Sequence, residues 1–122
     1  LFNNMKLIII DRDPRDIISD LSINNALLGV DFNLNRDLDK YITWHKYLRQ
    51  NESKKALKIN FENLILNEIQ TLDIVDEFIG EEPLHNKFDL YKSKKNIGIW
   101  KKNLNTKESD FIKKNIQYEY TD

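Results

Sequence analysis

The sequence predicts an α/β fold in which helices flank a parallel sheet. Two observations support this prediction. Residues 7–10 form a continuous apolar run rich in isoleucine, which is typical of a short, fully buried strand covered on both faces. The pattern then continues as helix, helix and strand, which is the order that builds a right-handed parallel crossover.

The first helix has a clear start signal. Asp13 can cap the unpaired amides of a helix, and Pro14 is tolerated at the first helical position. Asp16 in the first turn complements the helix dipole. We expect this helix to run to about Leu28, because Gly29 is a suitable residue just past its end.

The later elements follow from spacing and punctuation. Residues 36–50 have helical periodicity, with His45 on or near the apolar stripe and Trp44 expected in the core. Residues 56–61 alternate as a strand. Two short helices at 62–68 and 71–80, a loop at 81–95 and a terminal helix capped at Thr106 complete the chain.

Composition limits the class of protein. The 122 residues fit a single domain, 1–122, with one core. Charged residues make up 32% of the chain but give a net charge of −1, so no nucleic-acid or membrane partner is expected. No residue is a cysteine, which excludes disulfides and thiolate metal sites, and no apolar run is long enough to span a bilayer. A cytoplasmic location is favoured, although an N-terminal signal could precede this segment.

The loop at 11–14 is the first candidate binding site. In parallel sheets, ligands bind beyond the carboxyl ends of strands, where helix N-termini present unpaired amides. Arg12 stands in this place, and a guanidinium next to such amides suits a phosphate group. Arg12 could equally pair with Asp11, Asp13 or Asp16 on the surface, and the loop alone does not decide between the two interpretations.

A basic stretch near the end of the chain is the second candidate. Residues 92–104, KSKKNIGIWKKNL, place lysines around Gly98 and Trp100. Lysines suit a phosphorylated ligand, and glycine permits close approach of the backbone. Taken alone, the stretch is also typical of a solvated loop anchored to the core by Trp100.

Together the two stretches resemble the carboxyl-terminal half of the sulfotransferase family. These enzymes move a sulfuryl group from 3′-phosphoadenosine 5′-phosphosulfate (PAPS) to a hydroxyl or amine. The family's landmarks occur here in its order: Arg12-Asp13-Pro14-Arg15-Asp16, Phe61-Glu62-Asn63-Leu64, Phe78-Ile79-Gly80 and Gly98-Ile99-Trp100-Lys101. The resemblance implies part of a P-loop-kinase-like parallel sheet flanked by helices.

The resemblance also implies cofactor-binding residues. Arg12 and a serine would hold the 3′-phosphate, but the family's serine falls on Asp20 here, and a carboxylate would repel phosphate. Ser19 or Ser22 must therefore replace it, and we favour Ser19. The other implied contacts come from Phe61, Ser93, Lys94, Lys95, Gly98 and Trp100. Phe61 stands where many members have tyrosine, and Lys95 where they have glycine.

One family feature is missing from the sequence. The glycine-rich loop that binds the 5′-phosphosulfate and the catalytic residue both precede the matched region, and Gly29, Gly80 and Gly98 form no such loop. We therefore expect a carboxyl-terminal fragment of a longer domain that binds PAPS or its product, 3′,5′-adenosine bisphosphate, and has its catalytic residues elsewhere. The carboxylates are scattered and the histidines, His45 and His85, lie far apart, so no metal is expected.

Two alternatives from other classes stay open. One is a non-catalytic nucleotide-binding, anion-binding or interaction domain of the same fold. The other is a different nucleotide-binding α/β protein, such as a kinase relative, for which the missing phosphate loop is equally awkward. The acceptor substrate and the oligomeric state are not indicated by any residue pattern.

Overall fold

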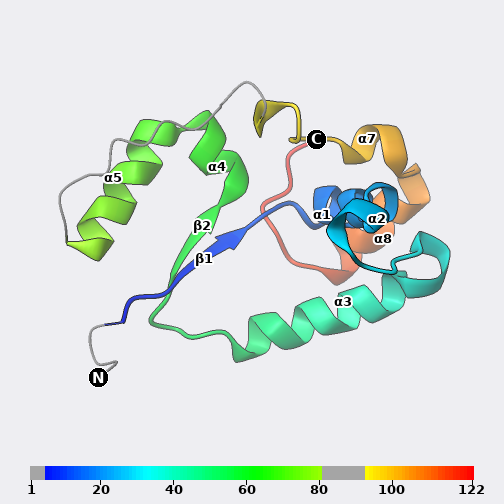
Figure 1. Ribbon diagram of the computed structural model, residues 1–122, viewed down its shortest axis with the longest axis horizontal. Coiled ribbons are helices and arrows are strands. Elements are labelled where there is room, and N and C mark those ends of the chain that lie inside the picture. The colour runs from blue at the N-terminus through cyan, green and yellow to red at the C-terminus, as the bar shows by residue number, and fades with distance from the viewer. Residues whose placement is uncertain (1–4, 81–92) are drawn as a thin grey trace. The chain divides into compact units, whose positions relative to one another are not determined.

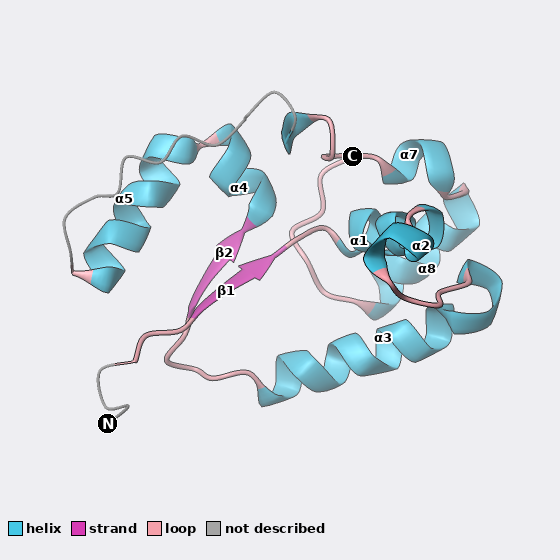
Figure 2. Cartoon of the chain, in the orientation of Figure 1, coloured by secondary structure: helices cyan, strands magenta, loops and turns pink. Residues whose placement is uncertain are grey.

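The computed structural model describes residues 5–80 and 93–122, and its class is mixed α/β as predicted (Figures 1 and 2). By its contacts the chain divides into two compact units, each built from two segments. Unit 1 comprises Leu1–Arg12 and Ser53–Lys95, and unit 2 comprises Asp13–Glu52 and Asn96–Asp122. Most of the predicted loop at 81–95, including His85, lies outside the described residues.

Unit 1 contains the sheet. Strands β1 (Ile8–Asp11) and β2 (Leu57–Asn60) pair in parallel, with Ile8 opposite Leu57 and Asp11 opposite Asn60, which confirms the predicted pairing. Helices α4 (Phe61–Leu66) and α5 (Glu68–Ile79) follow β2 and pack against each other (Figure 2). Over the described segments, the sheet of unit 1 consists of these two strands.

The expected cover on both faces of the first strand was wrong. The side chain of Ile10 is 58% exposed, and Ile8 and Ile9 are only partly buried. The described helices of unit 1 leave the Ile10 side of the sheet open, although apolar side chains of their own, such as Leu66 and Ile69, are exposed.

Unit 2 is helical. It contains α1 (Pro14–Ile23), α2 (Asn25–Leu28), α3 (Leu34–Asn51), α7 (Trp100–Asn103) and α8 (Thr106–Asn115). Helix α1 contacts α3, α7 and α8. The buried core of the unit comes from α1, α3, α8 and the residues that flank the helices: Ile18, Phe32, Tyr41, Ile42, Leu104, Ile112 and Ile116.

The helix start at Asp13 and Pro14 is confirmed, but the end of α1 was placed too late. The Asp13 carboxylate accepts a hydrogen bond from the Arg15 amide at 2.9 Å, and Pro14 begins the helix. The helix stops at Ile23 because Asn24 leaves the helical conformation, and its side-chain amide donates to Asp20 at 2.6 Å. Asparagine is a weak helix former and favours helix ends.

Two further expectations need correction. The cap of α8 is Asn105 instead of Thr106: its side chain accepts from the Glu108 amide, and Glu108 accepts from the Asn105 amide, a capping box. Trp44 is 55% exposed and lies outside the core, whereas the neighbouring His45 is buried as expected. The buried face of α3 follows Tyr41, Ile42 and His45, and Trp44 projects beside that face.

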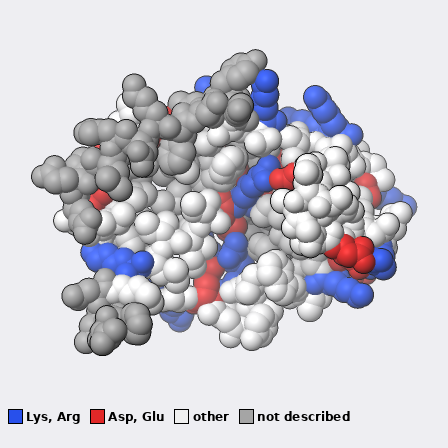
Figure 3. All heavy atoms as spheres, in the orientation of Figure 1, with Lys and Arg blue, Asp and Glu red and all other residues white. Residues whose placement is uncertain are grey.

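The distribution of surface charge and the length of the helices are relevant to nucleic-acid and membrane partners. On the face shown in Figure 3, basic and acidic side chains are interspersed, which agrees with the small net charge. In the part of the chain that the structure describes, no helix combines the length and the apolar character needed to cross a membrane.

Candidate functional site

The predicted phosphate residue Arg12 and the predicted cofactor residue Phe61 meet in unit 1. Arg12 directly follows β1, and Phe61 directly follows β2. Because the strands are parallel, both residues lie at the carboxyl edge of the sheet. The guanidinium carbon of Arg12 lies 5.3 Å from the centroid of the Phe61 ring. Arg12 is partly buried as a residue, and its Nε atom is buried.

The acidic residues near Arg12 in the sequence have structural roles of their own. Asp11 is buried, and its carboxylate accepts a hydrogen bond from the Arg12 amide at 3.1 Å. Asp13 caps α1 and pairs with Arg15. Asp16 accepts hydrogen bonds from the amides of Gly98 and Trp100. Each of these carboxylates thus has a structural role within its own unit.

In unit 2, Asp16 of helix α1 holds the loop at residues 98–100, which is part of the basic stretch. Its carboxylate is 1% exposed and accepts the Gly98 amide at 2.9 Å and the Trp100 amide at 3.1 Å. Gly98 has φ +81°, a conformation that favours glycine. The sequence predicted Asp16 as a helix-dipole residue or as a surface partner of Arg12, and did not predict this contact with the loop. The structure therefore gives the amides of two predicted cofactor residues an internal acceptor.

Arg15 was not predicted as a site residue from the sequence. In unit 2, however, its side chain is buried and contacts residues from several parts of the chain. Its side chain is fully buried and forms ion pairs with Asp13 at 2.7 Å and Asp122 at 2.5 Å. Its guanidinium carbon lies 3.9 Å from the centroid of the Trp100 ring. Burial lowers the pKa of Arg15, but the hydrogen bonds and charges of Asp13 and Asp122 outweigh burial and raise it above its ordinary value.

The two candidate serines lie on α1 in unit 2 and differ in exposure. Ser19 is fully buried, and its hydroxyl donates to the Arg15 carbonyl at 2.8 Å. Ser22 is partly exposed, and its hydroxyl donates to the Ile18 carbonyl at 2.8 Å. Exposure therefore favours Ser22 over Ser19 as a residue that a ligand could reach, and a phosphate role for either stays a prediction.

The predicted cofactor residues fall into both units. Arg12, Phe61, Ser93, Lys94 and Lys95 belong to unit 1, and Ser19, Ser22, Gly98 and Trp100 belong to unit 2. Lys94 and Lys95 are exposed, and Ser93 is partly buried. Within the units, the structure brings Arg12 to Phe61 and joins Gly98 to Trp100 through Asp16.

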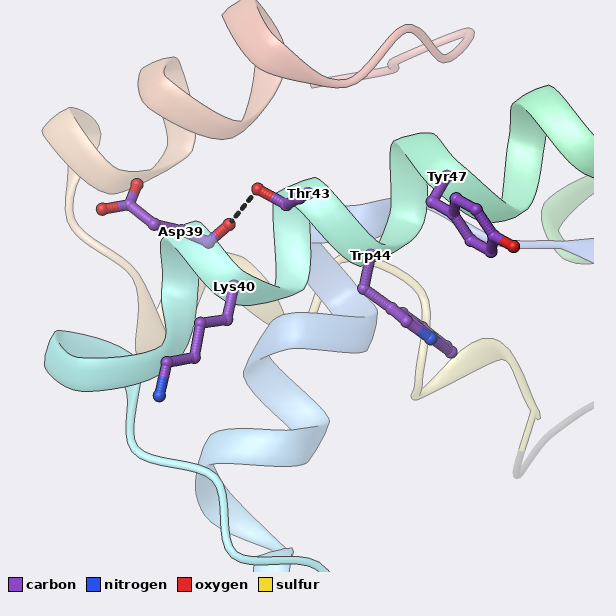
Figure 4. A pocket seen from close by; sticks show the side chains of 5 residues that line it. All are labelled: Asp39, Lys40, Thr43, Trp44 and Tyr47. Atoms are coloured by element: carbon purple, nitrogen blue, oxygen red, sulfur yellow. Dashed lines mark hydrogen bonds between the residues drawn. The ribbon is translucent and has the colours of Figure 1, made fainter.

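A surface pocket of about 520 Å³ lies on α3 (Figure 4). The described residues that line it are Asp39, Lys40, Thr43, Trp44 and Tyr47. The two rings extend from the helix side by side, and the Thr43 hydroxyl donates to the Asp39 carbonyl at 3.0 Å (Figure 4). The signal for this pocket was Trp44 itself, which the sequence analysis assigned to the core.

Neither a metal-binding cluster among the described residues nor a similar known protein indicates a function. Among residues 5–80 and 93–122, no cluster of three or more histidine, aspartate or glutamate side chains could hold a metal ion. Comparisons with protein-family models, curated proteins and solved structures found no match.

Proposed function

We propose that this chain is the 3′-phosphate-binding part of a PAPS-dependent sulfotransferase with a P-loop-kinase-like sheet. The observation that supports the proposal is the meeting of Arg12 and Phe61 at the carboxyl edge of two parallel strands, 5.3 Å apart. Both residues were chosen as cofactor contacts from the sequence motifs. Parallel strands of this kind commonly bind nucleotides beyond that edge.

The geometry suits the binding of a phosphate by Arg12. A guanidinium over an aromatic ring is held by the ring's negative face, and its N–H groups lie in the guanidinium plane instead of pointing at the ring. Those N–H groups can then donate two parallel hydrogen bonds to phosphate oxygens. Phe61 would thus orient Arg12 for its ligand, which is a reason why the ring is needed and a hydroxyl is not.

The reaction divides between this chain and residues outside it. An acceptor oxygen or nitrogen attacks the sulfur in line, and the bond from sulfur to the bridging oxygen of the nucleotide breaks. Cationic groups stabilise the charge that develops on that oxygen. The chain would supply grip and orientation through Arg12, and the catalytic base would come from elsewhere in the protein.

Calorimetry with Arg12→Ala tests the proposal. Loss of one charged hydrogen-bonding group costs about 2 kcal/mol, so the variant should bind 3′,5′-adenosine bisphosphate roughly 30-fold more weakly than the wild type. Binding of adenosine 5′-phosphate, which lacks the 3′-phosphate, should hardly change. Arg49→Ala is a matched control because Arg49 belongs to the other unit, where it pairs with Glu52 at the C-cap of α3.

The other outcomes separate the alternatives. Equal losses for both nucleotides would mean that Arg12 acts through folding. Wild-type protein that does not distinguish the two nucleotides would contradict the proposal. A non-catalytic binding domain predicts the same affinities but no sulfuryl transfer, so turnover of PAPS by the full-length protein separates it from the enzyme.

A further inference from the structure

The buried guanidinium of Arg15 presents two edges to two different groups. One edge, Nε and Nη2, is taken by Asp13, at 3.1 Å from Nε to Oδ1 and 2.7 Å from Nη2 to Oδ2. This pairing is local, because Asp13 is also the cap of α1. The faces of the group meet the rings of Trp100 and Tyr120, at 3.9 and 4.9 Å.

The other edge of Arg15 is taken by the last described residues of the chain. Nη1 donates to Oδ1 of Asp122 at 2.5 Å and lies 3.5 Å from the Ser109 hydroxyl, and Nη2 donates to the carbonyl of Thr121 at 3.1 Å. The second carboxylate oxygen of Asp122 accepts from Nζ of Lys113 at 3.0 Å. Two cations therefore hold three oxygens of the tail.

We propose that Arg15 and Lys113 form an oxyanion notch for a sulfate monoester, which the tail residues Thr121 and Asp122 occupy in cis. A guanidinium edge favours two oxygens of one anion, whereas here it receives one carboxylate oxygen and one carbonyl. A sulfate monoester has three terminal oxygens, the number that the tail supplies, and can offer two of them to Arg15 and one to Lys113.

Charge selects among the oxyanions. Arg15 and Lys113 carry two positive charges, and Asp13 compensates one of them. The notch therefore has one uncompensated positive charge when the tail is absent. A sulfate monoester carries one negative charge, whereas a phosphate monoester carries about −1.5 to −2 at neutral pH and would leave an excess beside Asp13.

The tail can be exchanged for a ligand without leaving the buried guanidinium of Arg15 unpaired. Residues 117–122 form no helix or strand, and the Asp122 side chain is 61% exposed. The tail's other contacts include the Tyr120 hydroxyl, which donates to the Ile116 carbonyl at 2.6 Å. When Asp122 leaves, Arg15 keeps its pair with Asp13, so the large penalty for an unpaired buried cation does not arise.

The test measures binding of phenyl sulfate to the full chain at constant ionic strength. Asp122→Ala removes the internal competitor and should tighten binding about tenfold. Asp110→Ala makes the same change in net charge at an exposed position of α8 and should leave the affinity unchanged. Adding Lys113→Ala to Asp122→Ala should abolish the gain, while adding Lys114→Ala should not, since Lys114 is exposed and takes no part in the notch.

Three results would overturn the proposal. The first is equal affinity for phenyl sulfate in the wild type, Asp122→Ala and Asp110→Ala. The second is tighter binding of phenyl phosphate than of phenyl sulfate at pH 7, because it would contradict the charge argument. If Asp122→Ala does not fold, hydrogen exchange of the wild type decides: saturating phenyl sulfate should speed exchange of the Tyr120 amide, and unchanged exchange would count against the notch.

Discussion

Arg12 and Arg15 stand three residues apart in one motif and have opposite environments. Arg12 follows β1 and lies partly exposed over Phe61. Arg15, in the first turn of α1, is fully buried between two carboxylates and two rings. A motif thus identifies residue types, while the surroundings decide whether a cation is open to a ligand or is already paired within the chain.

The difference has an energetic basis. A cation removed from water needs compensating charges and hydrogen bonds, and Arg15 has them in Asp13 and Asp122. Arg12 keeps solvent access, so a ligand phosphate can compete for it at a smaller desolvation cost. The predictions below test this contrast.

The largest effect is expected for Arg15→Ala. The substitution leaves the carboxylate of Asp13 buried without its partner, and breaking a buried ion pair in this way costs about 3–5 kcal/mol. Urea denaturation should show this loss in the free energy of unfolding. Arg49→Ala, which breaks a more exposed pair with Glu52, should cost less than about 1 kcal/mol. Similar losses for the two variants would erase the contrast.

Asp16→Ala should have the next largest effect. It removes an acceptor that is 1% exposed from the amides of Gly98 and Trp100, and charged hydrogen bonds contribute about 1.5–3 kcal/mol each, although the two will not add fully. We expect a loss of about 2–3 kcal/mol in the free energy of unfolding. Hydrogen exchange should quicken at both amides but not at the Ile116 amide in the C-cap of α8, and unchanged protection would show that another group holds the loop.

The fold was most predictable where one residue type determines local geometry. Asp13 and Pro14 gave the start of α1 because capping and a fixed φ are local effects. The apolar run at 7–10 predicted the strand, and the order of strand, helix, helix and strand predicted its parallel pairing. The end of α1 at Asn24 and the exposure of Trp44 were missed, because periodicity does not show which residues tertiary contacts will cover.

The candidate site was predictable only in part for a related reason. Strand ends and motif spacing were enough to select Arg12 and Phe61. The burial of Arg15 depends on Asp122, which is 107 residues away in the sequence, and on the ring of Trp100. A pairing over such a distance has no local pattern, so only the folded chain shows it.

Acid should weaken the Arg15 region through Asp122. Hydrogen bonds from Arg15 and then Lys113 lower the pKa of Asp122 below its ordinary value of about 3.9. A carboxylate with a lowered pKa contributes stability above its unfolded pKa, and this contribution is lost as the pH falls through the folded pKa. The free energy of unfolding should therefore fall more steeply below about pH 4 in the wild type than in Asp122→Asn.

Another carboxylate with a lowered pKa serves as the internal reference. Hydrogen bonds from Arg36 and then from the Asn33 amide lower the pKa of Asp37 to about 2. Its contribution should be the same in the wild type and in Asp122→Asn, so the difference between the two acid curves isolates Asp122. Superimposable curves would mean that Asp122 does not secure the tail in solution.

The smallest effect is expected at Arg12, and a double-mutant cycle with Arg12→Ala and Phe61→Leu measures it. A partly exposed cation over a ring contributes about 0.5–1 kcal/mol, so the coupling energy between the two substitutions should fall in that range. Zero coupling would mean that the ring does not orient Arg12, and the basis of the proposed phosphate site would be lost. Coupling above about 2 kcal/mol would indicate a desolvated cation, and Arg12 would then resemble Arg15, which is buried and paired within the chain.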